Sequence, residues 1–166
     1  SGPMIQAPMQ PQLSPTLVQH FLEHSADLTP DKTALVCEGR RWTYRALEEL
    51  ANRVANSLIA LGVKRGDRVG ICLRNSVEAV ASIFGVLKAG GVFVPVNATI
   101  KRDKLEYILN NCQATALVFD SRTSAKLIMA AESTAVSSLK GGLVTGPEEG
   151  TLTRWGRPVQ PWSSLE

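Results

Sequence analysis

Three short apolar runs constrain the fold of this chain more than any other feature. They are VGICL at residues 69–73, VFVPV at 92–96 and TALVF at 115–119. A continuous apolar run of this length is typical of a strand that is buried on both faces of a sheet. The segments between the runs, 76–89 and 101–112, have apolar residues at helical spacing. This alternation predicts an α/β fold, with a three-layer, doubly wound, mostly parallel sheet covered by helices on both faces.

The first third of the sequence predicts two more helices and a small N-terminal β-hairpin. In order, these are a helix at 16–28, hairpin strands at 34–37 and 41–42, and a helix that begins after Thr43 and ends before Gly62. Thr is a favourable residue for the N-cap of a helix, and Gly is favourable just past its C-terminus. The hairpin and the two helices are expected to precede the first buried strand.

The helix at 76–89 is apolar on nearly every side, so we expect it to be buried within a larger structure. Asn75 and Glu78 resemble a capping box at its start. Gly90 follows its end, and Pro95 should stand at the end of the next strand because proline cannot donate to a strand ladder.

The C-terminal quarter carries weaker signals. Residues 121–134 predict a helix, 143–144 a short strand, and 151–166 a loop. The glycine-rich stretch LKGGLVTG is interpreted as a plain loop, because nothing marks it as a phosphate-binding turn between a strand and a helix. The resulting division is a cleavage remnant and disordered lead at 1–15, one α/β domain at 16–150, and a linker at 151–166.

Composition excludes several classes of protein. The 166 residues are enough for a sizeable core, and 44% hydrophobic and 20% charged residues are ordinary for a globular protein. The net charge of +3 is mild, and the basic residues are not interleaved with aromatic ones, so we expect no nucleic-acid partner. We also expect no membrane span, because no apolar run is long enough.

The cysteines and histidines do not form a metal-ligand pattern. Cys37, Cys72 and Cys112 are far apart, which predicts reduced thiols in a cytoplasmic protein. His20 and His24 are one helical turn apart but have no third ligand nearby, so we expect surface histidines and no metal site. The sequence also lacks a GxxxxGK[ST] loop, a GxGxxG turn and a GxSxG elbow, and no catalytic residue is assigned.

Two motifs resemble those of a known enzyme family. WTYRALEEL at 42–50 resembles the first core motif of the acyl-adenylate-forming (AMP-binding) superfamily, and LKAGGVFVPVN at 87–97 resembles the second. The stretch DLTPDKTALVCEGRRWTY, which leads into the first motif, is similar to the opening of the same superfamily. The resemblance covers residues 16–120 well and identifies the chain as an N-terminal portion of such a ligase.

The resemblance implies an activity for the parent protein. The family activates a carboxylic acid with ATP to form acyl-AMP, and a thiol of CoA or of a carrier protein then displaces AMP, with Mg²⁺ balancing the phosphate charge. The family's Ser/Thr/Gly-rich phosphate loop, its acyl pocket and its C-terminal lid are absent from this sequence. We therefore expect the chain alone to be inactive, to bind no cofactor tightly, and to need the remainder of the ligase as its partner.

The resemblance also suggests a site on the loop after the second motif. Asn97 and the following KRDKLEYILNNC are more similar to acyl-CoA ligases than to peptide-synthetase adenylation domains, which usually carry Asp there. In some such ligases this loop contributes to the rim where the CoA nucleotide docks. The resemblance therefore implies that Thr99, Lys101 and Arg102 contribute to a CoA-binding rim. Lys101 and Arg102 also fit the solvated start of a helix.

Three other interpretations stay open. The chain could be an adenylation domain of a peptide synthetase. It could be a non-enzymatic α/β module that binds a protein partner or nucleotide. It could also be a flavodoxin-like protein with coincidental motifs. The sequence does not identify the acid.

Overall fold

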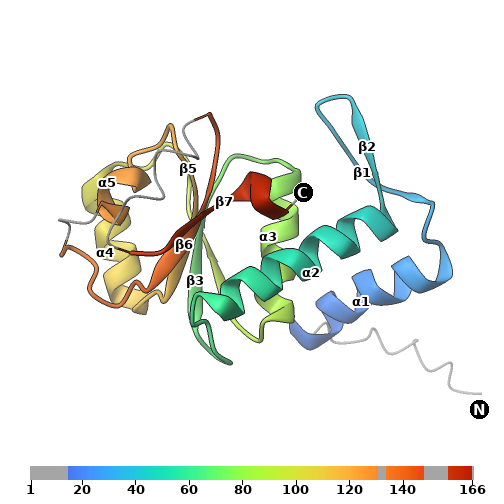
Figure 1. The fold of residues 1–166 in the computed structure, drawn as a ribbon, viewed down its shortest axis with the longest axis horizontal. Coiled ribbons are helices and arrows are strands. Elements are labelled where there is room, and N and C mark those ends of the chain that lie inside the picture. The colour runs from blue at the N-terminus through green and yellow to red at the C-terminus, as the bar shows by residue number, and fades with distance from the viewer. Residues whose placement is uncertain (1–14, 131–133, 148–156, 166) are drawn as a thin grey trace, which may run out of the picture.

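The computed structural model describes residues 15–130, 134–147 and 157–165, and its core is one parallel sheet with helices on both faces (Figure 1). The elements in chain order are α1 (Pro15–Leu28), β1 (Thr33–Cys37), β2 (Arg40–Thr43), α2 (Tyr44–Ala60), β3 (Arg68–Cys72), α3 (Val77–Lys88), β4 (Val92–Pro95), α4 (Arg102–Cys112), β5 (Ala116–Asp120), α5 (Ala125–Met129), β6 (Gly141–Thr145), β7 (Val159–Pro161) and a 3₁₀ helix (Trp162–Leu165).

The five strands from β3 to β7 form the main sheet in the order β4-β3-β5-β6-β7, and every pair is parallel. The strand order steps outward from β3 to β4, returns across β3 to β5, and then continues to β7. This is the pattern of a doubly wound sheet. The predicted fold class is confirmed, including the separate antiparallel hairpin of β1 and β2.

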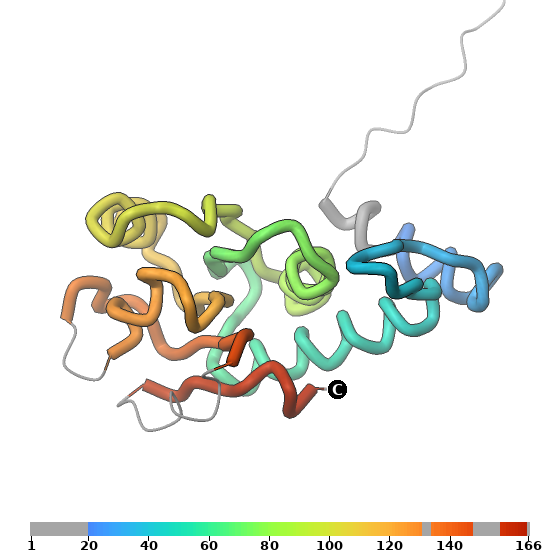
Figure 2. The backbone as a smooth tube through the Cα atoms, turned by 90° about the horizontal axis from the view of Figure 1, so that it is seen from above, coloured from blue at the N-terminus to red at the C-terminus, as the bar shows by residue number. Residues whose placement is uncertain are grey.

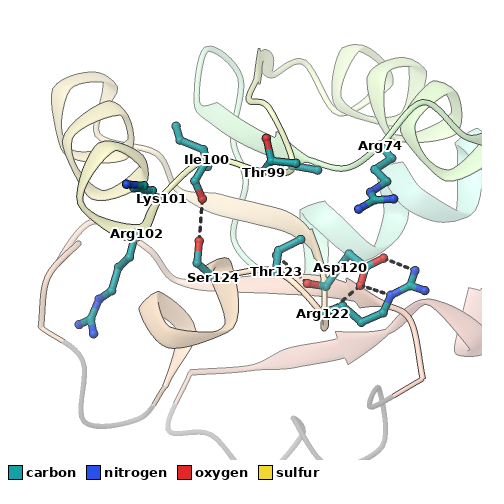
Figure 3. A pocket seen from close by; sticks show the side chains of 10 residues that line it. Arg74, Thr99, Ile100, Lys101, Arg102, Asp120, Arg122, Thr123 and Ser124 are labelled. Atoms are coloured by element: carbon teal, nitrogen blue, oxygen red, sulfur yellow. Dashed lines mark hydrogen bonds and ion pairs between the residues drawn. The ribbon is translucent and has the colours of Figure 1, made fainter.

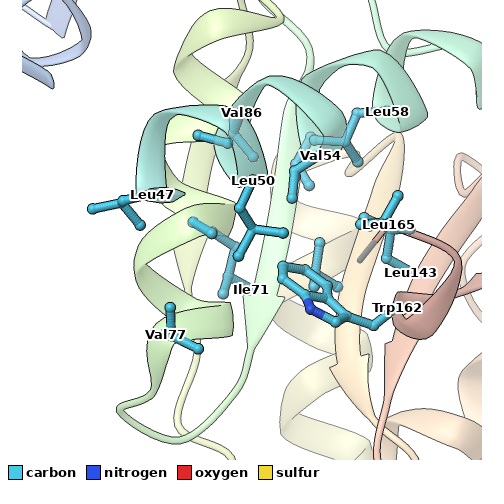
Figure 4. Packing of buried hydrophobic residues seen from close by; sticks show 14 of the residues in the cluster. Leu47, Leu50, Val54, Leu58, Ile71, Val77, Val86, Leu143, Trp162 and Leu165 are labelled. Carbon is cyan, nitrogen blue, oxygen red and sulfur yellow. The ribbon is translucent and has the colours of Figure 1, made fainter. Parts of the chain in front are cut away.

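Alternate side chains of each strand point to opposite faces, and each face has its own core. One core packs α1, α2, α3 and the 3₁₀ helix against residues such as Ile71, Val118 and Leu143 (Figure 4). The other packs α4 and α5 against Leu117 and Phe119. Seen from above, the helices of the two faces lie on opposite sides of the sheet (Figure 2). Burial on both faces explains the continuous apolar runs of β3 and β5. The expectation was wrong for β4, which is an edge strand whose four residues are exposed or only partly buried.

Local signals account for the hairpin and for the start of α2. Glu38 and Gly39 both have positive φ, +50° and +75°, as a tight two-residue hairpin turn requires. The Thr43 side chain accepts a hydrogen bond from the backbone N–H of Ala46 at 3.1 Å, so Thr43 is the predicted N-cap. Gly62 follows α2 with φ +100°, as expected for a residue just past a helix end.

The cap of α3 differs from the prediction by one residue. Ser76, not Asn75, is the N-cap, because its hydroxyl accepts a hydrogen bond from the backbone N–H of Ala79 at 3.2 Å. Ser76 also donates to the carbonyl of Arg74 at 2.9 Å, which fixes the turn before the helix. Glu78 still lies in the first turn, where a carboxylate favours the positive end of the helix dipole.

The helix predicted at 121–134 is much shorter in the structure. The backbone N–H of Arg122 donates to the Asp120 carboxylate at 2.8 Å, and the Thr123 hydroxyl donates to the Asp120 carbonyl at 2.7 Å. These bonds hold residues 121–124 in a turn, since short polar side chains compete with helical hydrogen bonds. The helix ends at Met129 because Ala130 is extended, with ψ 143°. Residues 131–133 lie outside the described residues.

The glycine-rich stretch was predicted as a plain loop apart from a short strand at 143–144. That strand is confirmed and is longer than predicted, since β6 spans Gly141–Thr145. All five residues of β6 are buried. A Cβ on Gly141 would lie 2.5 Å from the Pro158 carbonyl oxygen, and one on Gly142 would lie 2.6 Å from the Leu117 carbonyl oxygen. The glycines therefore serve close strand packing and not a flexible loop.

Residues 159–165 also differ from the predicted loop, because β7 adds an edge strand and the 3₁₀ helix packs back over the sheet. Pro161 stands at the end of β7, where its missing N–H is tolerated. The expected domain boundary at residue 150 lies outside the described residues and stays a prediction. The expected lead at 1–15 also lies outside them, except for Pro15, which begins α1.

Helix α3 is covered mainly by α2 and α1 (Figure 1). Ala81, Gly85 and Val86 are fully or nearly fully buried, and Ile83 and Phe84 are partly buried. The apolar character of α3 thus follows from helices packed on its outer side as well as from the sheet beneath it.

Candidate functional site

The carboxyl ends of β3, β4 and β5 meet at one edge of the sheet. The chain leaves β3 for α3 on one face and leaves β5 for α5 on the other face. β3 and β5 pair directly, with Cys72 of β3 beside Phe119 of β5. In open α/β sheets, neighbouring strands whose connections diverge in this way leave a crevice, and ligands bind there. The candidate site therefore lies beyond the ends of β3 and β5.

A cleft with a volume of about 540 Å³ occupies this position, and we call it the strand-end cleft (Figure 3). Three loops supply its walls, those that follow β3, β4 and β5. Its lining residues are Arg74, Ala98, Thr99, Ile100, Lys101, Arg102, Asp120, Arg122, Thr123 and Ser124.

All three residues carried over from the family resemblance line this cleft. Thr99 donates through its hydroxyl to the Asn97 side chain at 2.8 Å, and its backbone N–H donates to the same oxygen at 2.9 Å. Lys101 is exposed and immediately precedes α4. Arg102 is the first residue of α4, and its Nε donates to Glu106 at 2.8 Å. The structure thus brings the three together, although their role in binding stays a prediction.

Sequence reasoning missed the other polar residues of the cleft. Arg74 follows β3 by two residues, and Asp120 ends β5 and is followed by Arg122. Each follows a buried strand that the sequence did predict. What marks these residues is that β3 and β5 are neighbours in the sheet. Finding them from the sequence would therefore require the order of the strands and not only their positions in the chain.

Asp120 and Arg122 form a closely paired group at the floor of the cleft (Figure 3). Arg122 donates through Nε at 2.9 Å to one carboxylate oxygen and through an Nη at 2.6 Å to the other. These hydrogen bonds lower the pKa of Asp120, and the positive charges of Arg122 and Arg74 lower it further, against the opposing effect of burial. In return, Asp120 raises the pKa of Arg122, so both side chains stay charged at neutral pH.

Cys72 is the last residue of β3 and does not line the cleft. Its thiol is buried and donates a weak hydrogen bond to the Asn97 carbonyl at 3.7 Å. Burial, together with the negative charge of Asp120, raises the pKa of Cys72 to about 11. A thiol that stays protonated is a poor nucleophile, and Cys72 packs in the core on the side of α4 and α5.

A second cleft of about 510 Å³ adjoins the first, and we call it the apolar cleft. The two share Arg74, Ala98 and Thr99. The other lining residues of the apolar cleft carry no charge, namely Ile71, Leu73, Asn75, Ala79, Ile83, Pro95, Val96 and Asn97. One wall of the combined site is therefore cationic and the other is mainly apolar.

The histidines, the cysteines and the helices can be compared with what the sequence predicts for metal binding, thiols and membrane spans. His20 and His24 are exposed on α1, and the described residues hold no cluster of three or more His, Cys, Asp or Glu side chains suited to a metal ion. Cys37, Cys72 and Cys112 are free thiols. Among the described helices, none combines the length and the apolar character that crossing a membrane requires.

Comparison with known proteins decides the family. Residues 22–160 match the model of the family described as AMP-binding enzyme. The chain belongs to this family. It is 42% identical over 103 residues to the medium/long-chain-fatty-acid–CoA/3-oxocholest-4-en-26-oate–CoA ligase of Mycobacterium marinum, and it is 36% identical over 111 residues to tyrocidine synthase 1 of Brevibacillus parabrevis. The family resemblance of the two sequence motifs is thereby confirmed.

The chain corresponds to a small part of these AMP-binding relatives. The first match covers 62% of this chain and 19% of the ligase, and the second covers 67% of this chain and 10% of the synthase. The chain therefore spans about a fifth of the length of the curated CoA ligase that it matches.

Solved structures of AMP-binding enzymes share the fold. The anthranilate CoA ligase AuaEII, solved in complex with anthranoyl-AMP, matches with a TM-score of 0.76 and 29% identity over 97% of this chain and 29% of that chain. A long-chain-fatty-acid CoA ligase from Rhodopseudomonas palustris matches with a TM-score of 0.73 and 26% identity over 89% of this chain and 35% of that one.

Proposed function

We propose that this chain is the N-terminal portion of a ligase that activates a carboxylic acid with ATP and transfers the acyl group to the thiol of CoA. A carboxylate is a poor electrophile, and adenylation makes one of its oxygens a good leaving group. The thiol then takes the acyl group and AMP departs. The observation that carries the proposal is the match to the AMP-binding family across most of the chain, with CoA ligases among the relatives.

The donor set of the strand-end cleft fits the nucleotide end of CoA. Lys101 is an exposed cation and Arg102 lies at the rim, while the Thr99 hydroxyl would turn from Asn97 to donate to a phosphate. Phosphate groups bind to such cations and to hydroxyl donors. In the proposed function these three residues hold CoA at the outer edge, and no described residue is assigned to the reacting carbonyl.

ATP and Mg²⁺ belong to the proposal for the complete ligase. The sequence contains no Ser/Thr/Gly-rich loop that ends in Lys, which the resemblance assigns to the ATP phosphates. We therefore expect this chain by itself to form no acyl-AMP and to bind no cofactor tightly. The remainder of the ligase would supply that loop, the acyl pocket and the lid, in a cytoplasmic enzyme.

A carrier-protein thiol is the second candidate for the acyl acceptor. The identity of 36% to tyrocidine synthase 1 and of 41% to malpinin synthetase of Mortierella alpina favours this alternative. The cationic lining of the strand-end cleft favours free CoA, because its nucleotide carries phosphates that a cation can bind. In either case the activation chemistry is the same.

The test compares this chain with the product of its full coding region. We expect the full-length product to exchange pyrophosphate into ATP in the presence of a suitable carboxylic acid, and this chain to show no exchange with any acid. CoA should then accept the acyl group from the full-length product. A full-length product without exchange activity would overturn the proposal and leave a non-enzymatic α/β module as the better interpretation.

A further inference from the structure

The charges around the strand-end cleft do not balance. Four cations line it, Arg74, Lys101, Arg102 and Arg122, together with one carboxylate, Asp120. Arg122 is paired with Asp120, and Arg102 is paired with Glu106. Within the described residues, the other two cations, Arg74 and Lys101, form no ion pair with a carboxylate.

Arg74 is the better placed of these two. Its guanidinium makes no hydrogen bond or ion pair with any other described residue, although its charge is close enough to act on Asp120. Figure 3 shows its side chain directed into the cleft, toward the side occupied by Asp120 and Arg122. An unpaired guanidinium in a concave site has its fork of N–H donors free for a ligand.

The backbone around Arg74 is held in place. β3 is an inner strand of the sheet that ends at Cys72, and the Arg74 carbonyl accepts a hydrogen bond from the Ser76 hydroxyl at 2.9 Å. Ser76 in turn caps α3. A fixed backbone limits the positions that the guanidinium can reach, which reduces the entropy that binding must overcome.

Arg74 also marks the boundary between the two clefts. It lines both, and it is the charged residue of the apolar cleft, whose other walls include Ile83 and Pro95. A ligand held here would place an anionic group at Arg74 and could extend an uncharged part along the apolar cleft. A phosphate ester with an uncharged arm has this shape.

We propose that Arg74 is the anchoring residue for a phosphate group of the ligand in the strand-end cleft. Arg74 binds the phosphate through its guanidinium, while the neighbouring Arg122 stays bonded to Asp120. This assignment rests on the proposed function, in which the ligand is CoA. The phosphates of CoA and those of ATP are the two sources to be distinguished.

The test is an NMR titration of the whole chain with four probes: pyrophosphate, CoA, ATP with Mg²⁺, and pantetheine, which has no phosphate. We expect pyrophosphate and CoA to shift the amide signals of Thr99 and Thr123 with dissociation constants on the order of 1 mM, an affinity in keeping with a partial site. Arg74→Gln should weaken both at least tenfold and leave pantetheine unaffected.

Arg53→Gln is the matched control, because Arg53 is exposed on α2 and lies outside both clefts. It makes the same change in charge and should alter binding by less than twofold. Equal thermal midpoints of the two variants would show that each is folded.

The outcomes separate this inference from the proposed function. If Arg74→Gln binds CoA and pyrophosphate as the unmodified chain does, the role of Arg74 is overturned and the proposed function stands. If pyrophosphate binding depends on Arg74 but CoA does not bind, the role of Arg74 stands and CoA is the wrong ligand for the cleft. Binding of ATP that depends on Arg74, without binding of CoA, would assign the phosphate to ATP. No binding of any phosphate probe up to about 10 mM would overturn the role of Arg74.

Discussion

Asp120 accepts three hydrogen bonds from Arg122, one from its backbone N–H and two from its guanidinium, although the two residues are only two positions apart. The carboxylate ends β5 and the guanidinium folds back over it. This local pair closes the floor of the strand-end cleft and fixes the turn that shortens α5.

The pair should make stability depend on pH in the acid range. Because the folded state lowers the pKa of Asp120, its carboxylate stabilises the fold above its unfolded pKa of about 4, and that contribution is lost as the pH falls through the lower folded pKa. We therefore expect Asp120→Asn to reduce the free energy of unfolding at pH 7, with a difference that disappears at strongly acid pH. The effect should be modest because Arg122 is exposed. Urea unfolding at several pH values measures it.

Asp31→Asn is the control for Asp120→Asn. Asp31 also pairs with an arginine, Arg45 at 3.3 Å, but its side chain is 83% exposed and the pair is screened by water. We expect no measurable change at any pH. A difference between Asp120→Asn and the unmodified chain that stayed constant from pH 7 to pH 3 would contradict the pH argument.

Lys88 joins three helices from a nearly buried position. Its Nζ lies 2.9 Å from Glu23 of α1 and 2.7 Å from Glu48 of α2, and its side chain is 7% exposed. Lys88→Met should destabilise the protein by about 3 kcal/mol, because it leaves the largely buried Glu48 carboxylate without a cation. Combining it with Glu48→Met should recover most of that loss, since an apolar pair replaces the ion pair.

Arg45→Gln provides the comparison for Lys88→Met, because it breaks an exposed ion pair and should cost less than about 0.5 kcal/mol. Chemical denaturation of the four proteins measures these differences. If Lys88→Met were as stable as Arg45→Gln, the ion pairs of Lys88 would contribute little to the packing of α1.

The contact between α2 and α3 depends on Gly85. A Cβ on Gly85 would lie 2.5 Å from a methyl group of Val54, too close for any real contact. Gly85→Ala should therefore destabilise the protein by about 1–3 kcal/mol, although Ala normally favours a helix over Gly. Thermal or urea unfolding measures the change.

Ser82→Ala on the same helix should not lower the free energy of unfolding, in contrast to Gly85→Ala. The Ser82 hydroxyl is fully buried and has no partner among the described residues, so its removal costs no hydrogen bond and improves helix propensity. We expect the variant to be as stable as the unmodified chain or up to about 1 kcal/mol more stable. A stabilising Gly85→Ala would show that the two helices can move apart freely.

Much of the fold could be predicted because its signals are local. Thr43, Gly62 and Pro95 each mark an element boundary through a preference of that residue type, and the structure confirms all three. β3 and β5 stand out in the sequence because a strand covered on both faces needs no polar residue. The capping of α3 was harder, since Asn75 and Ser76 are both good caps and only the turn geometry selects between them.

The rest depends on contacts between distant segments. Gly141 and Gly142 look like a loop until Pro158 and Leu117 are seen against them. Thr99, Lys101 and Arg102 could be proposed from the family motif, whereas Arg74 becomes a site residue only when the order of the strands places it across from Asp120.

The segment after β7 was expected to be a linker, and Trp162 shows why it is part of the core. Its indole is 3% exposed and packs in the same cluster as Leu50, Val54 and Ile71 (Figure 4). Trp162→Ala should lower the free energy of unfolding by about 3–5 kcal/mol. Trp162→Phe should cost less than about 1.5 kcal/mol, because it keeps most of the volume and the buried indole N–H has no partner among the described residues. Urea unfolding followed by circular dichroism measures both, and a Trp162→Ala variant as stable as Trp162→Phe would mean that the 3₁₀ helix can leave the sheet without loss.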